Sequence, residues 1–560
     1  MITIDCRKTI CLLLGVTSCF AAIAQVPKPT LVVGIVVDQM RAEQLYRYQS
    51  KFSQDGFKRL MSNGFNYKNA QYNYTPTVTS AGHASIYTGT TPSGHGIVSN
   101  SWYDRTSNNY VQSVEDTEYS TVGSRQAESV GASPKNMLTT TISDQIKLSS
   151  QLRSKVISIS LKDRAAVLSG GHLADGVYWQ DTYASSGGFI TSSYYNAELP
   201  QWVEDFNAEG RADAYLDSKW TPLFDIESYT ESYADDNTYE IVLGEERAVF
   251  PYDFKVLREK YRPRNLEYLL LGLSPFGNTL VTEFALEALE RENLGKNGET
   301  DVLSISYSAT DKVGHLFGPD SVELADVYVR LDREIAALLS ELDRHLGKEG
   351  YVVFLTSDHG AIPVASYLEN VGIPTDVARI SQYKSVLQQG LNKALGQGDW
   401  LQHFSDNQVY LNRPLIREKG LALADVQRTA SDILVELDGI REALTATNLR
   451  VQNYTNHDSR HLAQNGYYQK RSGDVVVIFE SGVIQDDDSD LHVSLVKGTV
   501  HGSGYAYDTH VPLLIMGAGL NSGQSVRRVS PTDIASTIAM ILNIQPPSGN
   551  RGEPLYELFK

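Results

Sequence analysis

Six carboxylate and imidazole side chains are the residues of this sequence best suited to chemistry. Asp38, Asp311, His315, Asp358 and His359, together with a later histidine, supply oxygen and nitrogen ligands and no sulfur, which suits zinc or manganese. In two-metal sites with ions about 4 Å apart, one ion activates the nucleophile and the other stabilises the leaving oxygen of an in-line displacement. Each pair alone is equally typical of a cap or a salt bridge. Their recurrence in three clusters favours a metal site.

Hydroxyl side chains gather in one segment, residues 75 to 89 (TPTVTSAGHASIYTG). The segment is typical of a loop that enters a helix. A hydroxyl at such a helix N-terminus meets free backbone N–H groups, which stabilise a phosphoryl group. Serine and threonine are also common helix caps, so these physical arguments leave Thr77, Thr79 and Ser80 unranked as nucleophiles.

Four apolar, β-branched runs position these polar residues. Each run is apolar enough to be a strand buried on both faces of a parallel sheet. Ligands bind beyond the carboxyl ends of strands in such sheets, so one site assembled from distant segments is predicted. The fold class is therefore α/β, with a central and mostly parallel sheet. The runs and the polar groups that follow them are 31–37 with Asp38, 155–161 with 162–164, 301–307 with Asp311 and His315, and 351–355 with 356–360.

The segments between these runs predict covering helices and two insertions. Ser321 to Leu346 has helical apolar spacing and stops at Gly347. An insertion at about 172–290 is rich in aromatic residues, and we weigh a cap over the site against ordinary packing. A second insertion at about 362–495 combines a helical pattern at 423–437 with a strand-like run at 474–480, which predicts an α+β subdomain.

Composition and the first residues bear on partners and location. The 67 acidic residues outnumber the 49 basic ones, giving a net charge of −18, the wrong sign for a stable nucleic-acid partner. Residues 1–24 resemble a signal peptide, with Arg7 and Lys8 before an apolar run, which predicts a periplasmic or secreted protein. Lipid anchoring through Cys19 is the alternative. After residue 25 no apolar stretch approaches the ~20 residues of a membrane span.

The order of the motifs resembles one known family. The motifs are the Asp38 strand end, TSAGHASIYTG, HGIVSNSWYD, SLKDRAAVLSGG, SATDKVGHLFGP, TSDHG and GTVHGSGYAYDTHVPLL. They resemble those of the PafA/PhoK-type bacterial alkaline phosphatases, on the nucleotide pyrophosphatase/phosphodiesterase branch of the alkaline phosphatase superfamily. The resemblance implies a three-layer catalytic domain over residues 25–560 that hydrolyses small-molecule phosphate monoesters. It also implies two Zn²⁺ ions per site and a covalent phosphothreonine intermediate on Thr79. It leaves the oligomeric state open.

The resemblance also assigns the ligands. It implies one zinc, which activates Thr79, on Asp38, Asp358 and His359, and a second zinc on Asp311, His315 and His501. His501 is preferred to His510 as the last ligand, and His83 and His95 are expected to support the site without binding metal. The sequence departs from the family at Ser80-Ala81, where relatives often have Gly-Pro. We expect that change to affect the stiffness of the loop more than the chemistry.

Asn100, Lys162 and Arg164 bear on the substrate. A phosphate monoester has one more charged oxygen than a diester, and a lysine with a bidentate arginine would neutralise it. In the family these three residues mark monoesterases, so monoester hydrolysis is favoured and a phosphodiesterase or nucleotide pyrophosphatase is the alternative. A sulfatase would need a C/S-x-P-x-R motif, which Ser80 to Ala84 does not fit. A cytosolic mutase conflicts with the signal segment, and a binding protein without catalysis conflicts with the complete ligand set.

Overall fold

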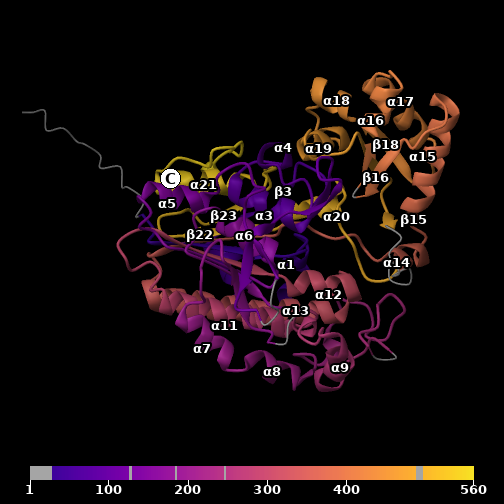
Figure 1. The fold of residues 1–560 in the computed structure, drawn as a ribbon. Coiled ribbons are helices and arrows are strands. Elements are labelled where there is room, and N and C mark those ends of the chain that lie inside the picture. The colour runs from indigo at the N-terminus through magenta and orange to yellow at the C-terminus, as the bar shows by residue number, and fades with distance from the viewer. Residues whose placement is uncertain are drawn as a thin grey trace, which may run out of the picture.

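The fold is a three-layer sandwich in which helices cover both faces of an 11-stranded sheet (Figure 1). The computed structural model describes residues 28–559 except 125–128, 183–185, 245–246, 406 and 487–495. The expected signal segment, with Cys19, lies outside the described residues. The α/β class with a sheet that is parallel at its centre is confirmed. Among the described helices, none has the length and apolarity required to cross a membrane.

The main sheet is parallel across its central strands, and both edges carry antiparallel pairs. Its strands, in spatial order, are β23 (Gly523–Ser525), β2 (Phe65–Tyr67), β22 (Leu513–Gly517), β14 (Tyr351–Thr356), β1 (Leu31–Val37), β13 (Asp301–Tyr307), β8 (Val156–Ser160), β9 (Gly176–Gln180), β10 (Phe189–Ser192), β6 (Glu115–Val122) and β7 (Val130–Ala132).

The register of the central strands explains why their polar ends meet. All seven residues of β1 are buried, with Val33 and Ile35 in the core of one face and Val36 in the core of the other. Val37 pairs with Tyr307 of β13, and Ser160 of β8 pairs with Ser306 of β13. The parallel strands therefore end at one edge of the sheet, where the chain continues into the predicted polar clusters.

Helices pack on the two faces according to their apolar sides. Helix α13 confirms the predicted helix at 321–346: Ser321 caps it, and its Oγ accepts a 3.1 Å hydrogen bond from the Leu324 N–H. The helices of the first face are α1 (Gln44–Arg47), α2 (Phe57–Asn63), α7 (Gln201–Ala208), α8 (Arg211–Leu216), α9 (Phe254–Tyr261), α10 (Leu269–Gly272), α11 (Pro275–Arg291), α12 (Ala309–Phe317) and α13 (Val322–Leu346). Those of the second face are α3 (Thr79–Thr88), α5 (Ile142–Ser149), α6 (Asp163–Gly170) and α21 (Asp533–Leu542).

The segment at 172–290 packs as part of the core. Its strands β9 and β10 belong to the main sheet, and α7 to α9 lie beyond α11 and α13 on the first face (Figure 1). Tyr178, Trp220 and Tyr229 are buried in the core of that face. Of the two interpretations left open by the sequence, ordinary packing therefore explains these aromatic residues.

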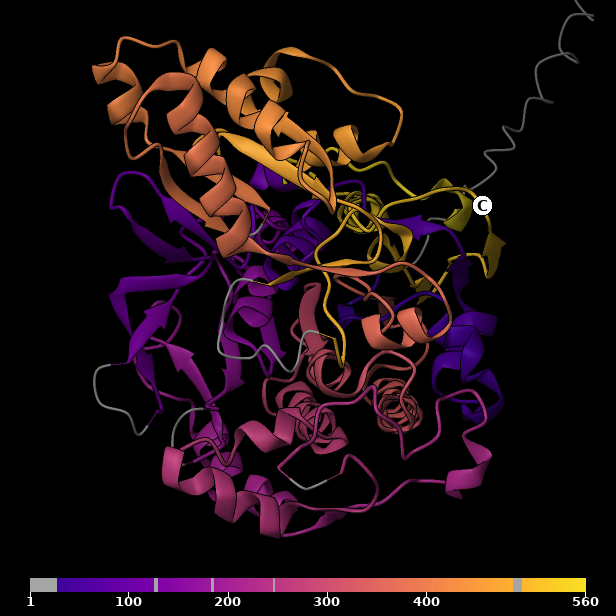
Figure 2. The ribbon, with the colours of Figure 1, turned by 90° about the vertical axis from the view of Figure 1, so that its right-hand side faces the viewer.

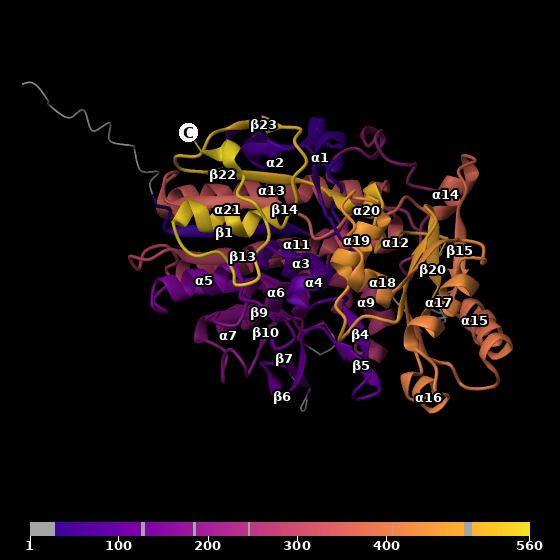
Figure 3. The same cartoon turned by 90° about the horizontal axis from the view of Figure 1, so that it is seen from above.

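The segment after β14 contains an α+β subdomain beside one end of the sheet (Figures 1 and 3), and Figure 2 views the molecule from that side. Its four-stranded antiparallel sheet has the order β16 (Leu401–Ser405), β17 (Gln408–Leu411), β19 (Val475–Phe479) and β18 (Ile440–Thr445). Its helices are α15 (Ile380–Leu395), α16 (Arg413–Glu418), α17 (Leu423–Leu434), α18 (Ala446–Val451) and α19 (Ser459–Gly466). The parallel pair β15 (Asp376–Arg379) and β20 (Val483–Asp486) lies where the subdomain joins the core.

Short elements complete the fold. The remaining helices are α4 (Pro92–His95), α14 (Ala365–Asn370) and α20 (Ala506–Thr509). The remaining strands pair as β3 (Ala70–Gln71) with β21 (His510–Val511), β4 (Ser101–Asp104) with β5 (Asn109–Gln112), and β11 (Lys219–Trp220) with β12 (Tyr252–Asp253).

Candidate active site

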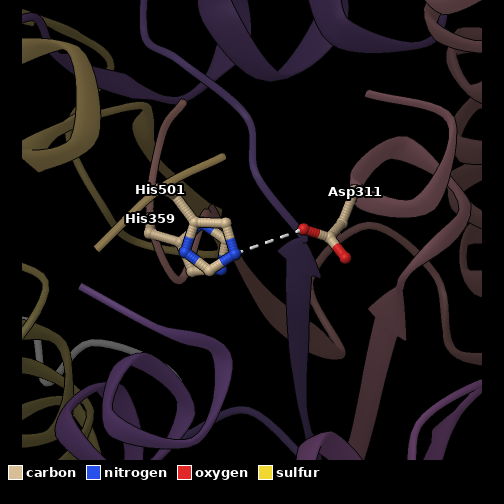
Figure 4. Close-up of side chains that lie close together, drawn as sticks. All are labelled: Asp311, His359 and His501. Carbon is tan, nitrogen blue, oxygen red and sulfur yellow. Dashed lines mark ion pairs between the residues drawn. The ribbon is translucent and has the colours of Figure 1, made fainter. Parts of the chain in front are cut away.

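Two groups of potential metal ligands meet at the carboxyl edge of the sheet. Asp38, Asp358 and His359 form one group, and Asp311, His359 and His501 form the other, with the ligand atoms of each group within 4.8 Å of one another. Figure 4 shows the second group, in which His501 Nε2 lies 3.7 Å from Asp311 Oδ1. The two groups share His359, so they form one continuous centre.

The predicted ligand His315 joins the second group through Asp311. Its Nε2 lies 3.1 Å from Asp311 Oδ1, as expected for residues four apart on α12. The His501 ring stacks on the His359 ring at 3.6 Å between centroids. The structure thus brings all six predicted ligands into one centre, at the ends of three different strands and in the loop after residue 497.

Backbone carbonyls orient the three imidazoles. The Nδ1 atoms of His315, His359 and His501 lie 2.8, 3.0 and 2.9 Å from the carbonyl oxygens of Thr499, Gly360 and Thr77. Each ring therefore directs Nε2 toward the carboxylates, as in metal sites. Burial lowers the pKa of His359 and of His501, which favours the neutral imidazole that binds metals.

Lys162 lies between the two ligand groups. Its Nζ donates hydrogen bonds of 2.7 Å to Asp38 Oδ2 and to Asp311 Oδ2, and one of 3.3 Å to Thr79 Oγ1. Burial acts to lower the pKa of Lys162, but the Asp311 and Asp38 carboxylates outweigh it and raise that pKa. A permanent ammonium group is thus held beside the candidate nucleophile.

The centre still contains acceptors that the protein leaves unsatisfied. Asp38 Oδ1 and His359 Nε2 are buried and have no hydrogen-bond partner among the described residues. Burial, with Asp311 and Asp358 close by, raises the pKa of Asp38 well above its usual value. Buried carboxylates crowded in this way are stabilised by cations. The donor set of carboxylate oxygens and neutral imidazoles therefore fits zinc or a similar divalent ion.

Thr79 is the first residue of helix α3. Val78 before it is extended, so the helix begins at the threonine. The first N–H groups of the helix have no partner within it and point outward from this end, where the Thr79 hydroxyl lies. The buried Thr79 side chain is 1% exposed and contacts the Lys162 ammonium. Gly82 permits this position of α3, because a Cβ there would lie 2.3 Å from the Asp358 carbonyl oxygen.

Asn100 contacts the first turn of α3, and Arg164 belongs to the first turn of α6. Asn100 Oδ1 accepts a 2.9 Å hydrogen bond from the Ser80 N–H, which fixes the amide at the first turn of α3. Arg164 follows Lys162 in the first turn of α6, and its Nε is buried without a hydrogen-bond partner among the described residues. Asn100 is therefore fixed at the start of α3, and Arg164 lies two residues after Lys162 with a guanidinium N–H that is unpartnered in the described part of the chain.

Three other histidines lie outside the two ligand groups. His83 Nδ1 is 2.9 Å from the Thr79 carbonyl oxygen and 3.3 Å from Asp358 Oδ2, so it supports a ligand and the nucleophile together. His95 contacts Ser85 Oγ at 3.0 Å, and burial lowers its pKa to about 3. His510 Nε2 lies 2.9 Å from the Lys68 carbonyl oxygen. The structure thus places His501 in a ligand group, and places His83, His95 and His510 in neither group.

Gln39 is a site residue that the sequence analysis did not identify. Its Nε2 donates a 2.8 Å hydrogen bond to Asp311 Oδ1, and its N–H donates a 3.2 Å bond to Asp358 Oδ1. One residue thus bridges a carboxylate of each ligand group. Its backbone is left-handed, with φ of 66°, which is uncommon for a residue other than glycine. Its position directly after Asp38 was the only available signal in the sequence.

Gln39→Asn tests this bridge while keeping a side chain that tolerates left-handed backbone. The shorter amide loses its reach to Asp311, so divalent metal affinity is expected to fall by about 10- to 100-fold, as for other residues that orient ligands. Calorimetric titration of the metal-free protein with zinc measures the change. Gln71→Asn, in β3, is the control and should bind zinc like the wild type. If both variants bound zinc with the same affinity, Gln39 would have no role in orienting the metal ligands.

Asp508 fixes the loop that carries His501. Its Oδ2 accepts hydrogen bonds of 3.1 Å from the Gly502 N–H, and of 2.7 and 2.6 Å from the Ser503 N–H and Oγ. Burial nevertheless raises the pKa of Asp508 to about 7. The folded state therefore favours the protonated carboxyl at acidic pH.

The pH dependence of stability should reveal this carboxyl. A raised folded-state pKa gives stability that is complete below the unfolded-state pKa and is lost as the pH rises to about 7. Asp508→Asn removes this loss, so the stability of the variant relative to the wild type should rise with pH by up to about 1.4 kcal/mol per unit within that window. Urea unfolding of both proteins at several pH values measures it. If the difference in free energy of unfolding between the two proteins did not change with pH, the pKa of Asp508 would not be raised in the folded state.

The fold and the centre together define a class of protein. A buried hydroxyl at a helix N-terminus, between carboxylates and neutral imidazoles at the carboxyl edge of a three-layer sheet, is the arrangement of an α/β enzyme of the alkaline phosphatase class. Comparison with known proteins identifies the family within that class.

The chain belongs to the type I phosphodiesterase/nucleotide pyrophosphatase family, whose model matches residues 32–503. Alkaline phosphatase PhoV of Synechococcus elongatus is 38% identical over 99% of this chain and 100% of its own. Alkaline phosphatase PafA of Elizabethkingia meningoseptica is 38% identical over 95% of each chain. The crystal structure of wild-type PafA matches with a TM-score of 0.88 and 37% identity, over 96% of this chain and 100% of that one. The predicted resemblance is confirmed, and the chain is an enzyme of the alkaline phosphatase group.

Proposed function

We propose that the protein hydrolyses phosphate monoesters to an alcohol and inorganic phosphate, through a phosphothreonine intermediate on Thr79. The observation that carries the proposal is the position of the Lys162 ammonium, 3.3 Å from Thr79 Oγ1 and bonded to a carboxylate of each ligand group. A phosphoryl group on Thr79 would lie within reach of this cation. The alkaline phosphatases PhoV and PafA among its relatives support the same reaction.

Two divalent ions, which we propose to be zinc, would be held by the six ligands. Asp38, Asp358 and His359 would hold one ion beside Thr79, and Asp311, His315 and His501 would hold the other. When bound, such ions lower the pKa of nearby hydroxyl groups and stabilise charge on departing oxygens. The unsatisfied Asp38 Oδ1 and His359 Nε2 and the lowered pKa values of His359 and His501 support this assignment.

The protein's own groups would perform two displacements. Thr79 Oγ would attack phosphorus in line, forming the Oγ–P bond as the bond to the alcohol oxygen breaks and the alcohol leaves with a proton. A water molecule would then attack the same phosphorus and break the Oγ–P bond, so that phosphate is released and a proton of this water restores the Thr79 hydroxyl. The N–H groups at the start of α3, apart from that of Ser80, which donates to Asn100, would face the phosphoryl oxygens in both steps.

Lys162, Arg164 and Asn100 would select the monoester. The dianionic phosphoryl group of a monoester offers three free oxygens, whereas a diester places an alkyl or aryl group on one of them. Lys162 is held as a cation by Asp38 and Asp311, and the guanidinium of Arg164 supplies a bidentate donor. Phosphodiesterase or nucleotide pyrophosphatase activity on the same scaffold is the alternative, and the family name includes both.

The test compares an aryl phosphate monoester with the matching diester, with zinc and after chelation. We expect monoester turnover to exceed diester turnover, and chelation to abolish both until zinc is restored, because the ligand carboxylates then lack their counter-charges. Preference for the diester would favour the alternative and leave the position of Lys162 unexplained. Full turnover after exhaustive chelation would refute the metal assignment.

The signal-like residues 1–24 support export of the enzyme to the periplasm or the medium.

A further inference from the structure

A cavity of about 530 Å³ adjoins the site and extends beneath the subdomain. On the site side it is lined by Val78, next to Thr79, and by the histidines His315 and His501. On the other side it is lined by residues of α19, β19 and β20. A molecule bound at Thr79 and extending past the two histidines would therefore enter this space.

The walls of the cavity combine apolar side chains with polar ones such as Arg441 and Glu480. Among the apolar lining residues, Leu462 of α19 and Phe479 of β19 are buried at 4% and 7% exposure, and Ile478 of β19 is half-buried. Tyr505 and Tyr507 add two rings 5.7 Å apart. The Tyr505 hydroxyl donates a 2.9 Å hydrogen bond to the Phe479 carbonyl oxygen, which connects the loop carrying His501 to the subdomain.

The phosphoryl group does not account for this space. Lys162, Thr79 and Asp38 are not among the residues that line the cavity, whereas Val78 beside Thr79 is, so the binding groups for the phosphoryl oxygens lie next to this space. The volume lies in the range of pockets that enclose drug-sized ligands. The apolar side chains of such a pocket contribute binding energy when they remove apolar surface of the ligand from water.

We infer that this cavity binds the alcohol part of the substrate and favours bulky alcohols with an aromatic or apolar part over small ones. The inference rests on the proposed function, because it uses the phosphoryl group at Thr79 to orient the ester. The α+β subdomain then determines substrate preference, while the core supplies the chemistry. His315 and His501, which line the cavity, lie where the two parts of the ester would join.

The experiment uses two inhibitors that carry no scissile ester bond, phenylphosphonate and biphenyl-4-ylphosphonate, against hydrolysis of phenyl phosphate by the full chain. The second ring should enter the cavity, so the biphenyl compound is expected to inhibit the wild type on the order of tenfold more tightly. Ile478→Trp fills the cavity from β19 and should reduce this ratio to about one. Inorganic phosphate has no alcohol part and should inhibit the wild type and the variant equally. Val435→Trp, an exposed position on the subdomain, is the matched control and should keep the ratio.

Leu462→Trp, from the facing helix, repeats the test if Ile478→Trp does not fold. Equal inhibition of the wild type by both phosphonates, or an unchanged ratio in the folded tryptophan variants, would overturn the inference while leaving the phosphatase proposal intact. Absence of phenyl phosphate hydrolysis would instead refute the proposed function. Calorimetric binding of the two phosphonates would then still report whether the cavity accepts the second ring.

Discussion

Thr79→Ala is expected to reduce monoester turnover by on the order of 10⁴- to 10⁶-fold, the loss that follows removal of a catalytic nucleophile. The reason is geometric: Thr79 Oγ1 is the hydroxyl that contacts the Lys162 ammonium at the N-terminus of α3. Steady-state hydrolysis of an aryl phosphate measures the loss. Mass spectrometry of acid-quenched wild-type enzyme should locate the phosphoryl group on Thr79, and no adduct should form on the variant.

Two further variants make this result specific. Thr79→Ser keeps the hydroxyl and should retain most of the turnover. Thr77→Ala removes a neighbouring hydroxyl whose Oγ1 donates a 2.8 Å hydrogen bond to the Ser503 carbonyl oxygen, so it should cost far less than Thr79→Ala. Zinc content should be equal in all three proteins. A Thr79→Ala protein with wild-type turnover, or a phosphoryl group found on Thr77 or Ser80, would refute the assignment.

Lys162→Ala is expected to lower kcat/KM for a monoester by about 10²- to 10³-fold, as does the loss of one preorganised donor to transition-state charge. The diester has less charge to neutralise, so its kcat/KM should fall much less and the preference for monoesters should shrink. Parallel assays with matched aryl substrates measure both values. Equal losses on the two substrates would show that Lys162 acts on metal binding or folding and does not select the monoester.

The ion pairs of Lys162 require a control for stability. Its removal leaves the buried Asp38 and Asp311 carboxylates without their ammonium partner, so the metal-free variant should be less stable than the wild type. Zinc supplies the missing positive charge, and the difference in melting temperature should narrow when zinc is added. Lys155→Ala, at the opposite end of strand β8, removes a more exposed pair with Glu292 and should leave substrate preference unchanged.

The site residues that could be predicted from the sequence are those that come soon after a strand in the chain. Asp38 directly follows a buried strand, the Asp358-His359 pair follows another after one residue, and Asp311 and His315 share one face of α12. These relations depend on local sequence, so apolar runs and spacing were sufficient to predict them. The resemblance to the family added His501 and the choice of Thr79, which spacing alone could not supply.

The sequence by itself determined the α/β class, the strands, the long helix α13 and the chemical type of the ligands, because burial and periodicity leave local signals. Only the tertiary structure placed Lys162 between Asp38 and Asp311, and Gln39 between Asp311 and Asp358. It also placed the aromatic residues of 172–290 in the core, and the subdomain along the cavity. These contacts join residues more than a hundred positions apart, and they depend on the register of β1, β8 and β13 and on how the subdomain docks. Hydrophobic periodicity reports which face of an element is buried and carries no information about the partner that buries it.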